Sequence, residues 1–269
     1  MRGSATRTRA PAVAGTFYPG DPVALAAVVD GYIAASPYGG VPPKALAVPH
    51  AGYAYSGPVA GTGYATLAAA RSTISRVVLL GPAHRVRVDG LAAPAADAFL
   101  TPLGPVEIDA EARERALALP GVLVDDAAHA PEHSLEVHLP FLQRALREFV
   151  VLPLAVGYPR GDMVVRVLDA LWGGPETLIV VSTDLSHYLD YEAAAERDLR
   201  TARAVTALDA EGIGDRDACG AYALRALLQV AAVRGLDARL LDLRSSGDTA
   251  GSRDSVVGYG AFGFWEAAS

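Results

Sequence analysis

A single cysteine, Cys219, occurs among the 269 residues of the chain. One thiol cannot form an intramolecular disulfide, and it cannot provide the several cysteines of a structural zinc site. Because Cys219 lies beside an alanine-rich segment that predicts a helix, we expect it to fill the core rather than to act as a nucleophile.

The chain also lacks long hydrophobic runs. No segment approaches the roughly 18 apolar residues that a membrane span needs. The N-terminal stretch MRGSATRTRAPAVAG is positively charged but has no apolar region, so it does not resemble a secretory signal. We therefore expect a soluble, cytoplasmic protein without a membrane partner.

Positive charge is scarce and scattered. Lys and Arg number 23 against 30 Asp and Glu, which gives a formal net charge of −7, and the one short basic cluster is Arg2, Arg7 and Arg9. A protein that binds nucleic acid needs a basic patch, and the sequence offers none. We expect no nucleic-acid partner.

What the sequence does have is a globular composition, 51% hydrophobic and 20% charged, in a length that suits one large domain. No shift in composition marks an internal boundary. We predict a flexible N-terminus over residues 1–10 and a single domain over residues 11–269.

Short apolar runs alternate with longer alanine-rich segments. Runs of Val, Leu and Ile bounded by Pro, Gly or Asp are typical of strands that are buried on both faces, as in a parallel sheet. We predict such strands at 45–50, 76–84, 149–157, 177–187 and 238–246, a hairpin region at 86–108, a late antiparallel strand at 254–266, and helices at 57–71, 109–118, 133–147, 161–172, 191–208 and 217–234. This alternation predicts an α/β fold with a central, mostly parallel sheet flanked by helices.

Polar residues follow the predicted strands where each strand ends. They are His50 after the first strand, His84 after the second, Asp184 and His187 after the fourth, and Ser245, Ser246 and Asp248 after the fifth. Ligands bind at the carboxyl ends of the strands in open α/β sheets, so we expect these groups at one edge. Two imidazoles and a carboxylate suit non-haem Fe(II), and zinc can use a similar set, while a further histidine could transfer protons. For each histidine taken alone, the alternative is a residue that merely ends a strand.

Residues 129–143, HAPEHSLEVHLPFLQ, hold half of the six histidines. His133 and His138 are five residues apart, which puts them on different faces of a helix, and neither the HExxH nor the HxxEH zinc motif is present. His133 and Glu136 share a helical face, so they could border a site or orient a ligand, or they could simply begin a helix. We expect His129 in a solvated loop.

The glycines of HAGYAYSGPVAG do not form a phosphate-binding motif, and Ser56 lacks the GxSxG setting of a hydrolase nucleophile. They suit a tight passage from strand to helix. Tyr53 and Tyr55 could line a pocket or belong to the core.

Taken together, the motifs of this chain resemble those of the Memo family. They are AGTFYPGD (14–21), VPHAGYAYSGPVAG (48–61), LLGPAH (79–84), EHSLEVHLPFLQ (132–143), STDLSHY (182–188) and SSGD with DSVVGYGAF (245–262), in order over nearly the whole chain. The resemblance implies a Memo-like single domain similar in fold to the LigB-like class III extradiol dioxygenases, which are non-haem iron enzymes. It also implies a functional link to AMMECR1-domain and radical-SAM proteins. A shared fold does not transfer function, which the site must support.

The resemblance also assigns roles to individual residues. His50 and His84 match metal-ligand positions, and His187 matches the acid/base position, with Asp184 beside it. Animal members carry a cysteine after a Ser-Ser pair at the third ligand position, where this chain has Asp248. With Asp248 as third ligand the set favours Fe(II), and zinc or copper are the other candidates. Tyr53, His133 and Glu136 are expected around the substrate or behind the ligands.

Three functions fit these features. The first is a dioxygenase-type oxidoreductase that acts on a small aromatic or vicinally oxygenated substrate, with Fe(II) held by the ligand set and His187 transferring protons. The second is a binding or adaptor protein that uses the same pocket for a peptide or a phosphorylated ligand. The third is metal-assisted hydrolysis. Neutral imidazoles are needed for ligation, so metal binding should fail in acid.

Overall fold

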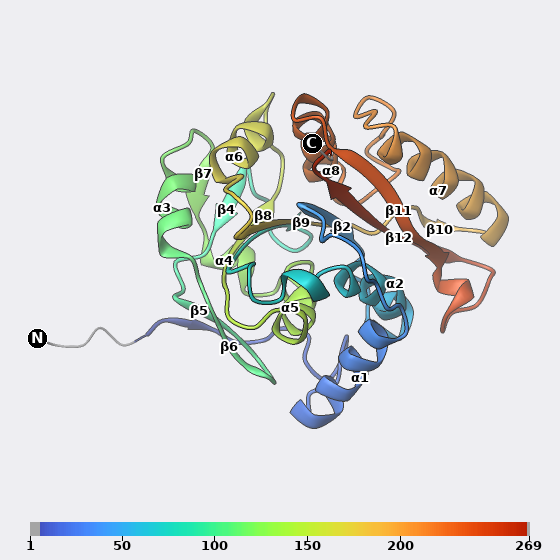
Figure 1. Cartoon of the computed structure of the whole chain (residues 1–269), viewed down its shortest axis with the longest axis horizontal. Helices are drawn as coiled ribbons and strands as arrows, with labels where there is room; N and C mark the ends of the chain where they lie inside the picture. Colours follow the sequence, from blue (N-terminus) through green and yellow to red (C-terminus); the bar gives the residue numbers. More distant parts are fainter. Residues whose placement is uncertain (1–5, 268–269) are drawn as a thin grey trace, which may run out of the picture.

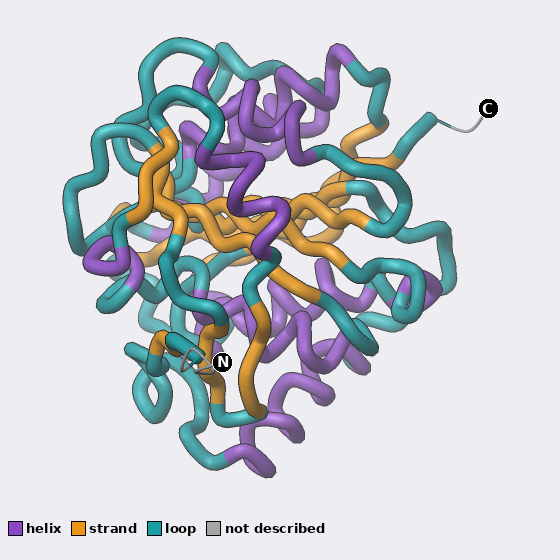
Figure 2. Tube along the Cα trace, turned by 90° about the vertical axis from the view of Figure 1, so that its left-hand side faces the viewer, coloured by secondary structure: helices purple, strands orange, loops and turns teal. Residues whose placement is uncertain are grey.

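The computed structural model describes residues 6–267, and its centre is a nine-stranded mixed sheet between two layers of helices (Figure 1). Figure 2 shows the strands of this sheet as a band with helices above and below it. The strands are β2 (Ala45–Val48), β3 (Arg76–Pro82), β4 (Leu91–Ala93), β7 (Val122–Val124), β8 (Val150–Val156), β9 (Thr177–Ser182), β10 (His187–Leu189), β11 (Asp237–Ser245) and β12 (Val256–Trp265).

The middle of the sheet is parallel and its flanks are mixed. The order is β10-β12-β2-β9-β3-β8-β4-β7, with β11 also paired to β12. β2 pairs with β9, and β3 pairs with both β9 and β8, all in parallel. β12 runs antiparallel to β2, and β4 runs antiparallel to β8. The predicted α/β fold with a central sheet flanked by helices is therefore confirmed, and the last strand is antiparallel as expected. The middle of the sheet is parallel as predicted, but the sheet as a whole is mixed, because β11, which was expected among the parallel strands, runs antiparallel to β12.

The apolar runs became central strands because both faces of the sheet are covered. Successive side chains of a strand point to opposite faces. In β3, Val78 and Leu80 belong to one hydrophobic core, whereas Val77 and Leu79 belong to the other. Both faces therefore need apolar residues, which explains why these strands show continuous hydrophobic runs rather than alternation.

Two groups of helices cover the two faces. The helices are α1 (Pro22–Ala34), α2 (Tyr53–Ala65), α3 (Ala110–Leu117), α4 (Asp126–His129), α5 (Leu139–Ala145), α6 (Met163–Leu171), α7 (Tyr191–Thr206) and α8 (Ala221–Val233), with short 3-10 helices η1 (Ala68–Ala70), η2 (Glu136–His138) and η3 (Ser246–Asp248). Residues of α1, α2 and α5 contribute to one core, and residues of α3, α6, α7 and α8 contribute to the other.

Helix α1 was not predicted, although its sequence carries a start signal. Asp21 caps the helix by accepting a hydrogen bond from the backbone N–H of Ala24, and Pro22 occupies the first turn. An acidic cap followed by proline is a typical helix N-terminus. The helix, PVALAAVVDGYIA, has no clear polar face, so its sequence lacks the amphipathic pattern that indicates a helix.

A three-stranded sheet, β1-β5-β6, lies outside the main one and includes the N-terminal segment. Its strands are β1 (Thr8–Arg9), β5 (Ala98–Thr101) and β6 (Gly104–Glu107), and β5 and β6 form the hairpin expected within 86–108. Of the ten residues expected to be flexible, 1–5 lie outside the described residues, while Thr8 and Arg9 pair in parallel with β5 and Arg9 is buried. The chain is therefore part of the fold from Thr8 onward.

Among residues 6–267, no helix combines the length and the hydrophobicity that crossing a membrane requires.

Candidate metal centre

A cavity of about 840 Å³ opens at the carboxyl ends of the central strands. His50 follows β2, His84 follows β3, Asp184 follows β9, and His187 begins β10, and all four side chains line this cavity. The tertiary structure therefore brings together the polar residues that the sequence places at the ends of three neighbouring strands.

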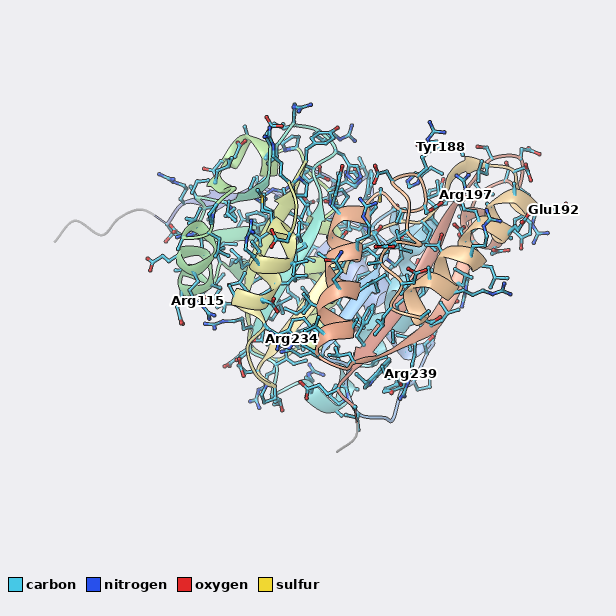
Figure 3. The ribbon with its side chains drawn as sticks, turned by 90° about the horizontal axis from the view of Figure 1, so that it is seen from above. Arg115, Tyr188, Glu192, Arg197, Arg234 and Arg239 are labelled. Carbon is cyan, nitrogen blue, oxygen red and sulfur yellow. The ribbon has the colours of Figure 1, made fainter. Side chains whose placement is uncertain are left out.

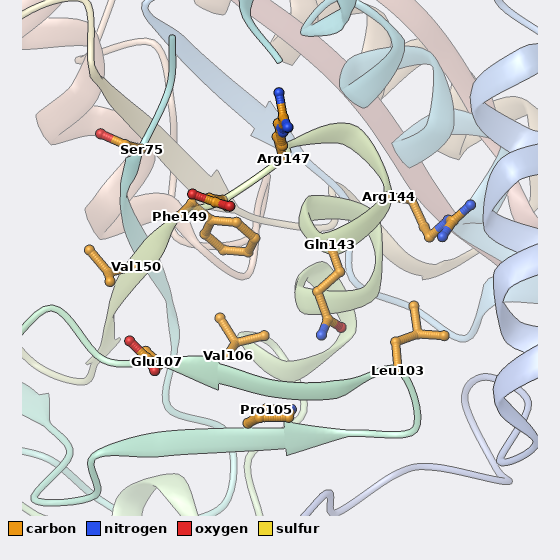
Figure 4. Close-up of a pocket in the computed structure, with 11 residues that line it drawn as sticks. Ser75, Leu103, Pro105, Val106, Glu107, Gln143, Arg144, Arg147, Phe149 and Val150 are labelled. Carbon is orange, nitrogen blue, oxygen red and sulfur yellow. The ribbon is translucent and has the colours of Figure 1, made fainter. Parts of the chain in front are cut away.

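A second cavity, of about 680 Å³, lies between β6, the end of α5 and the start of β8 (Figure 4). It is at the amino ends of β3 and β8, on the opposite edge of the sheet, because Ser75 and Val150 line it. The described residues of its wall include no histidine or cysteine. The second cavity therefore offers no imidazole or thiol that could bind a metal ion.

Three imidazoles meet in that first cavity. One ring nitrogen each of His50, His84 and His133 lies within 4.8 Å of the other two. The ring centroids of His50 and His84 are 5.2 Å apart, and those of His84 and His133 are 4.9 Å apart. Three convergent imidazoles are a donor set that suits zinc, copper or iron.

His50 makes its short hydrogen bond through Nδ1, so Nε2, which lies 3.4 Å from the sulfur of Cys219, is the nitrogen that can bind a metal. Ser182 donates its hydroxyl proton to the carbonyl of Ser134 at 2.6 Å. The Ser182 oxygen must therefore accept the hydrogen bond from Nδ1–H of His50, also at 2.6 Å. With Nδ1 protonated, the neutral ring keeps its lone pair on Nε2, which is the tautomer that can bind a metal.

The buried carboxylate of Glu132 orients His84. Glu132 Oε1 accepts Nδ1–H of His84 at 3.0 Å, so Nε2 of His84 is free to act as ligand. Burial by itself would raise the pKa of Glu132, but the hydrogen bonds from the ring and backbone of His84 and from the N–H of Ser134 outweigh it and lower the pKa to about 2. Glu132 is therefore ionised at neutral pH, and no sequence motif pointed to this role.

His133 contributes the third imidazole. Its Nδ1 is buried and makes no hydrogen bond, although it lies 3.3 Å from Glu132 Oε1. Burial lowers the pKa of His133. Burial also lowers the pKa of His50 well below the usual value, and the nearby His84 is the second cause of that shift. Both rings are thus neutral at pH 7, which is the form that binds metal ions. A buried ring nitrogen of His133 without a hydrogen-bond partner, close to the neutral ring of His50, fits a bound metal ion.

His187 and Asp184 flank the three imidazoles. Nδ1–H of His187 donates to the carbonyl of Leu185 at 2.7 Å, so Nε2 is the nitrogen that can accept a proton. Asp184 Oδ1 accepts the backbone N–H of His50 at 2.8 Å, and Oδ2 lies 3.9 Å from His50 Nε2. Burial raises the pKa of Asp184, and the hydrogen bond from His50 opposes that shift.

Cys219 also reaches this cavity. Its sulfur lies 3.4 Å from Nε2 of His50 and accepts a hydrogen bond from the backbone N–H of Asp184. Burial, assisted by the charge of Asp184, raises the pKa of the thiol well above its usual value. The cysteine is therefore a neutral thiol at the edge of the cluster, and it lacks the lowered pKa of a nucleophile.

Asp248, which we expected to be the third ligand, lies elsewhere. Its Oδ2 accepts hydrogen bonds from the backbone and hydroxyl of Ser245, and its Oδ1 accepts one from Tyr191. These contacts cap η3 and use both oxygens of the carboxylate. Asp248 does not line the cavity of the three histidines, and the third member of the histidine cluster is His133.

Tyr53 and Glu136 do not line the cavity, and the expectation of a solvated loop for His129 is wrong. Tyr53 belongs to the core, which was one of its two expected alternatives, and it donates its hydroxyl to the carbonyl of Val137. Glu136 turns away from His133, because η2 begins only at Glu136 and His133 precedes it in an irregular segment. His129 is buried at the end of α4, where Nε2 bonds the carbonyl of Ala92.

Glu136 instead anchors the N-terminal segment. Its carboxylate accepts hydrogen bonds from Arg9, from the backbone N–H groups of Ala12 and Val13, and from the hydroxyl of Tyr18. Arg9 in turn donates to the carbonyl of Glu132 at 2.6 Å. The N-terminal segment therefore supports the loop that carries Glu132 and His133.

Comparison with known proteins gives consistent matches over nearly the whole length. The family model described as "Memo-like protein" matches residues 9–262. A MEMO1 family protein of Aquifex aeolicus is 39% identical over 264 residues, which cover 94% of this chain and 97% of that protein. A MEMO1 family protein of Methanopyrus kandleri is 36% identical over 281 residues, which cover 95% of this chain and 98% of that protein.

Among solved structures, an uncharacterized protein of Escherichia coli K12 has a similar fold. The TM-score is 0.51 at 15% sequence identity, and the match covers 80% of this chain and 98% of the other. At this identity the similarity concerns the fold alone.

Proposed function

Because the chain belongs to the Memo-like protein family, we propose that it is a metal-dependent enzyme whose ion is held by His50, His84 and His133. The observation that carries this proposal is the convergence of three imidazoles in a cavity of about 840 Å³. A cavity of this size accommodates a small molecule, and it brings that molecule next to the three rings.

The first candidate reaction is oxidative and of the extradiol dioxygenase type, on a small aromatic or vicinally oxygenated substrate. Bound Fe(II) would supply redox chemistry with dioxygen, whereas bound zinc would supply a water of lowered pKa. The protein's own contribution is to orient the ligands through Glu132 and Ser182, and to accept a proton at Nε2 of His187. The position of His187 in the cavity wall supports its role as the acid/base residue.

Hydrolysis is the second candidate, and one observation favours it. The cluster of three histidines contains no carboxylate, and Asp248 is not part of it. Two histidines with a carboxylate are the set of many non-haem iron oxygenases, whereas three histidines also hold catalytic zinc. The identity of the metal therefore decides between the two reactions.

Metal loading followed by two assays tests the proposal. The protein is purified anaerobically, titrated with Fe(II) and with zinc, and its bound metal is measured. Oxygen uptake is then followed with catechols and aminophenols for the iron-loaded protein, and ester hydrolysis is followed for the zinc-loaded protein. Oxygen uptake with iron alone supports the first candidate, and hydrolysis with zinc alone supports the second.

Single variants test the ligand set. His50→Ala, His84→Ala and His133→Ala should each lower metal stoichiometry or affinity strongly, whereas Asp248→Ala should leave it unchanged. Loss of metal in Asp248→Ala with retention in His133→Ala would contradict the three-histidine set. A protein that takes up neither metal, yet binds a phosphotyrosine peptide, would instead indicate the adaptor function.

A further inference from the structure

The wall of the metal cavity carries an excess of positive charge in a protein whose net charge is −7. Three arginines line it, Arg85, Arg197 and Arg216, against two aspartates, Asp184 and Asp215. Both aspartates are already engaged. Asp215 accepts a hydrogen bond from Arg225 at 2.7 Å, and Asp184 accepts the backbone N–H of His50. The guanidinium groups are therefore not neutralised by the acids of the same wall.

Two of these arginines are available to a ligand. Arg85 and Arg216 are exposed, and neither forms an ion pair with an acidic residue in the part of the chain that the structure describes. Arg197 forms a long ion pair, in which its Nε is 3.7 Å from Oδ1 of Asp217. Figure 3 shows Arg197 and Tyr188 at the same end of the molecule, and both line the cavity.

Two helices also begin at this cavity. Gly52 precedes α2, and Ala218 and Cys219 come just before α8, and these residues line the cavity. Each helix has 13 residues and a glycine as its N-cap residue, with the N–H of Gly220 donating to the hydroxyl of Thr183 and the N–H of Tyr53 donating to the carbonyl of Phe17. The N-terminus of a helix carries a partial positive charge and favours nearby anions, so both helices add to the field of the arginines.

An aromatic ring is available beside these charges. Tyr188 is 78% exposed, lines the cavity, and has a φ of 59°, which is rare for a residue other than glycine. Its ring centroid is 5.7 Å from that of His187. Residues other than glycine that are held in this backbone region cluster at active sites and ligand-binding sites, which fits a ligand next to Tyr188.

We propose that the mouth of the metal cavity is an oxyanion subsite, in which Arg85 and Arg216 bind a carboxylate or phosphate group of a small substrate. The inference rests on the proposed function for the remainder of that substrate, which would reach the three histidines. Arginine suits this role because its planar guanidinium binds both oxygens of a carboxylate or phosphate at once. The subsite selects anionic substrates over neutral ones of the same shape.

A matched pair of probes tests this selection. Catechol and 3,4-dihydroxybenzoate differ by one carboxylate, and their dissociation constants are measured calorimetrically with metal-loaded protein. We expect the benzoate to bind about tenfold more tightly, which corresponds to about 1.4 kcal/mol and to one or two charge-assisted hydrogen bonds. Arg85→Gln combined with Arg216→Gln should remove this preference and leave catechol binding unchanged.

Arg87→Gln is the matched control. Arg87 is two residues from Arg85 but does not line the cavity, and its guanidinium already pairs with Asp89 at 2.9 Å. This variant should keep the preference for the carboxylate. Equal affinity of the wild type for both probes, or an unchanged preference in the double variant, would overturn the subsite.

Titrations of metal-free protein test the oxyanion subsite independently of the metal centre. Benzoate, phenyl phosphate and inorganic phosphate are titrated into metal-free protein, where the arginines act without the ion. We expect weak binding that the double arginine variant abolishes and that His50→Ala retains. If none of the three anions binds the wild type, the subsite is wrong, whatever the metal assays show. If the anions bind but metal does not, only the proposed function is wrong. The pair of phosphate and carboxylate probes also shows which oxyanion the subsite prefers.

Discussion

The carboxylate of Glu132 holds His84 at two points. Oε2 accepts the backbone N–H of His84 at 2.6 Å, and Oε1 accepts Nδ1–H of its ring at 3.0 Å. The same Oε1 accepts the backbone N–H groups of His133 and Ser134 at 2.9 and 2.8 Å. One buried carboxylate therefore fixes the two cluster histidines that come from different parts of the chain.

Replacing Glu132 should weaken metal binding without removing a ligand. In Glu132→Gln, the amide keeps one acceptor oxygen but loses the charge that favours Nδ1–H of His84. We expect metal affinity to fall about 10- to 100-fold, as is usual when the partner of a ligating histidine is lost. Competition with a chromophoric chelator measures it. Glu211→Gln, at an exposed turn, is the control, and equal affinity in both variants would argue against the orienting role.

Arg9 should be important for stability although it is near the start of the chain. Arg9→Met removes the buried positive charge that pairs with Glu136 and leaves that carboxylate without a counter-charge, which should cost about 3–5 kcal/mol of unfolding free energy. Urea denaturation measures the loss. The exposed pair of Arg144 and Asp30 provides the contrast, since Arg144→Gln should cost less than about 1 kcal/mol. Similar losses in the two variants would show that the burial of Arg9 has no special effect.

The free energy of unfolding should decrease at acidic pH, partly because His129 is buried. Burial lowers the pKa of His129 to about 4 in the folded protein, while in the unfolded chain it is about 6.5. Between these values the unfolded state binds more protons, so the free energy of unfolding decreases as the pH falls through this window, by about 3 kcal/mol in total from this group. Above pH 6.5 the contribution is fully present.

The variant His129→Gln isolates this contribution. Glutamine can still donate to the carbonyl of Ala92, but it does not titrate. Denaturation of metal-free protein at several pH values from 4 to 7.5 should show a shallower dependence in the variant. His50 and His138 also have a lowered pKa from burial, so the difference between the two proteins is the informative quantity. Parallel curves would show that His129 is protonated alike in both states.

Two glycines in helices should respond in opposite ways to alanine. A Cβ at Gly61 in α2 would lie 2.7 Å from backbone atoms of Tyr32 in α1, which cannot move away easily. Gly61→Ala should therefore destabilise the protein by about 1–3 kcal/mol. A Cβ at Gly31 in α1 would have no other atom within 4 Å, so Gly31→Ala should stabilise the protein by about 0.5–1 kcal/mol. Thermal or urea unfolding of both variants checks the contrast, and a stabilised Gly61→Ala protein would contradict the close packing of α1 on α2.

The sequence by itself determined the central parallel strands and the edge of the sheet at which the polar residues lie. Continuous apolar runs specify central strands because a sheet covered on both faces needs hydrophobic residues at every position. Once β2, β3 and β9 are parallel neighbours, the residues that follow them must lie side by side. His50, His84 and Asp184 could therefore be placed together from the pattern of the sequence.

Only the tertiary structure decided which residue completes the cluster. His133 is in an irregular segment whose path depends on Glu132, on Arg9 and on Glu136, and Arg9 and Glu136 are 127 positions apart in the chain. Helical spacing paired His133 with Glu136, but the hydrogen bonds to the N-terminal segment turn Glu136 away. Asp248 lies away from the histidine cluster for a similar reason, because its carboxylate accepts hydrogen bonds from the hydroxyl and backbone of Ser245 and from the hydroxyl of Tyr191. Strand ends are fixed by periodicity, whereas loop side chains are fixed by partners that are distant in sequence, and single-chain patterns do not reveal those partners.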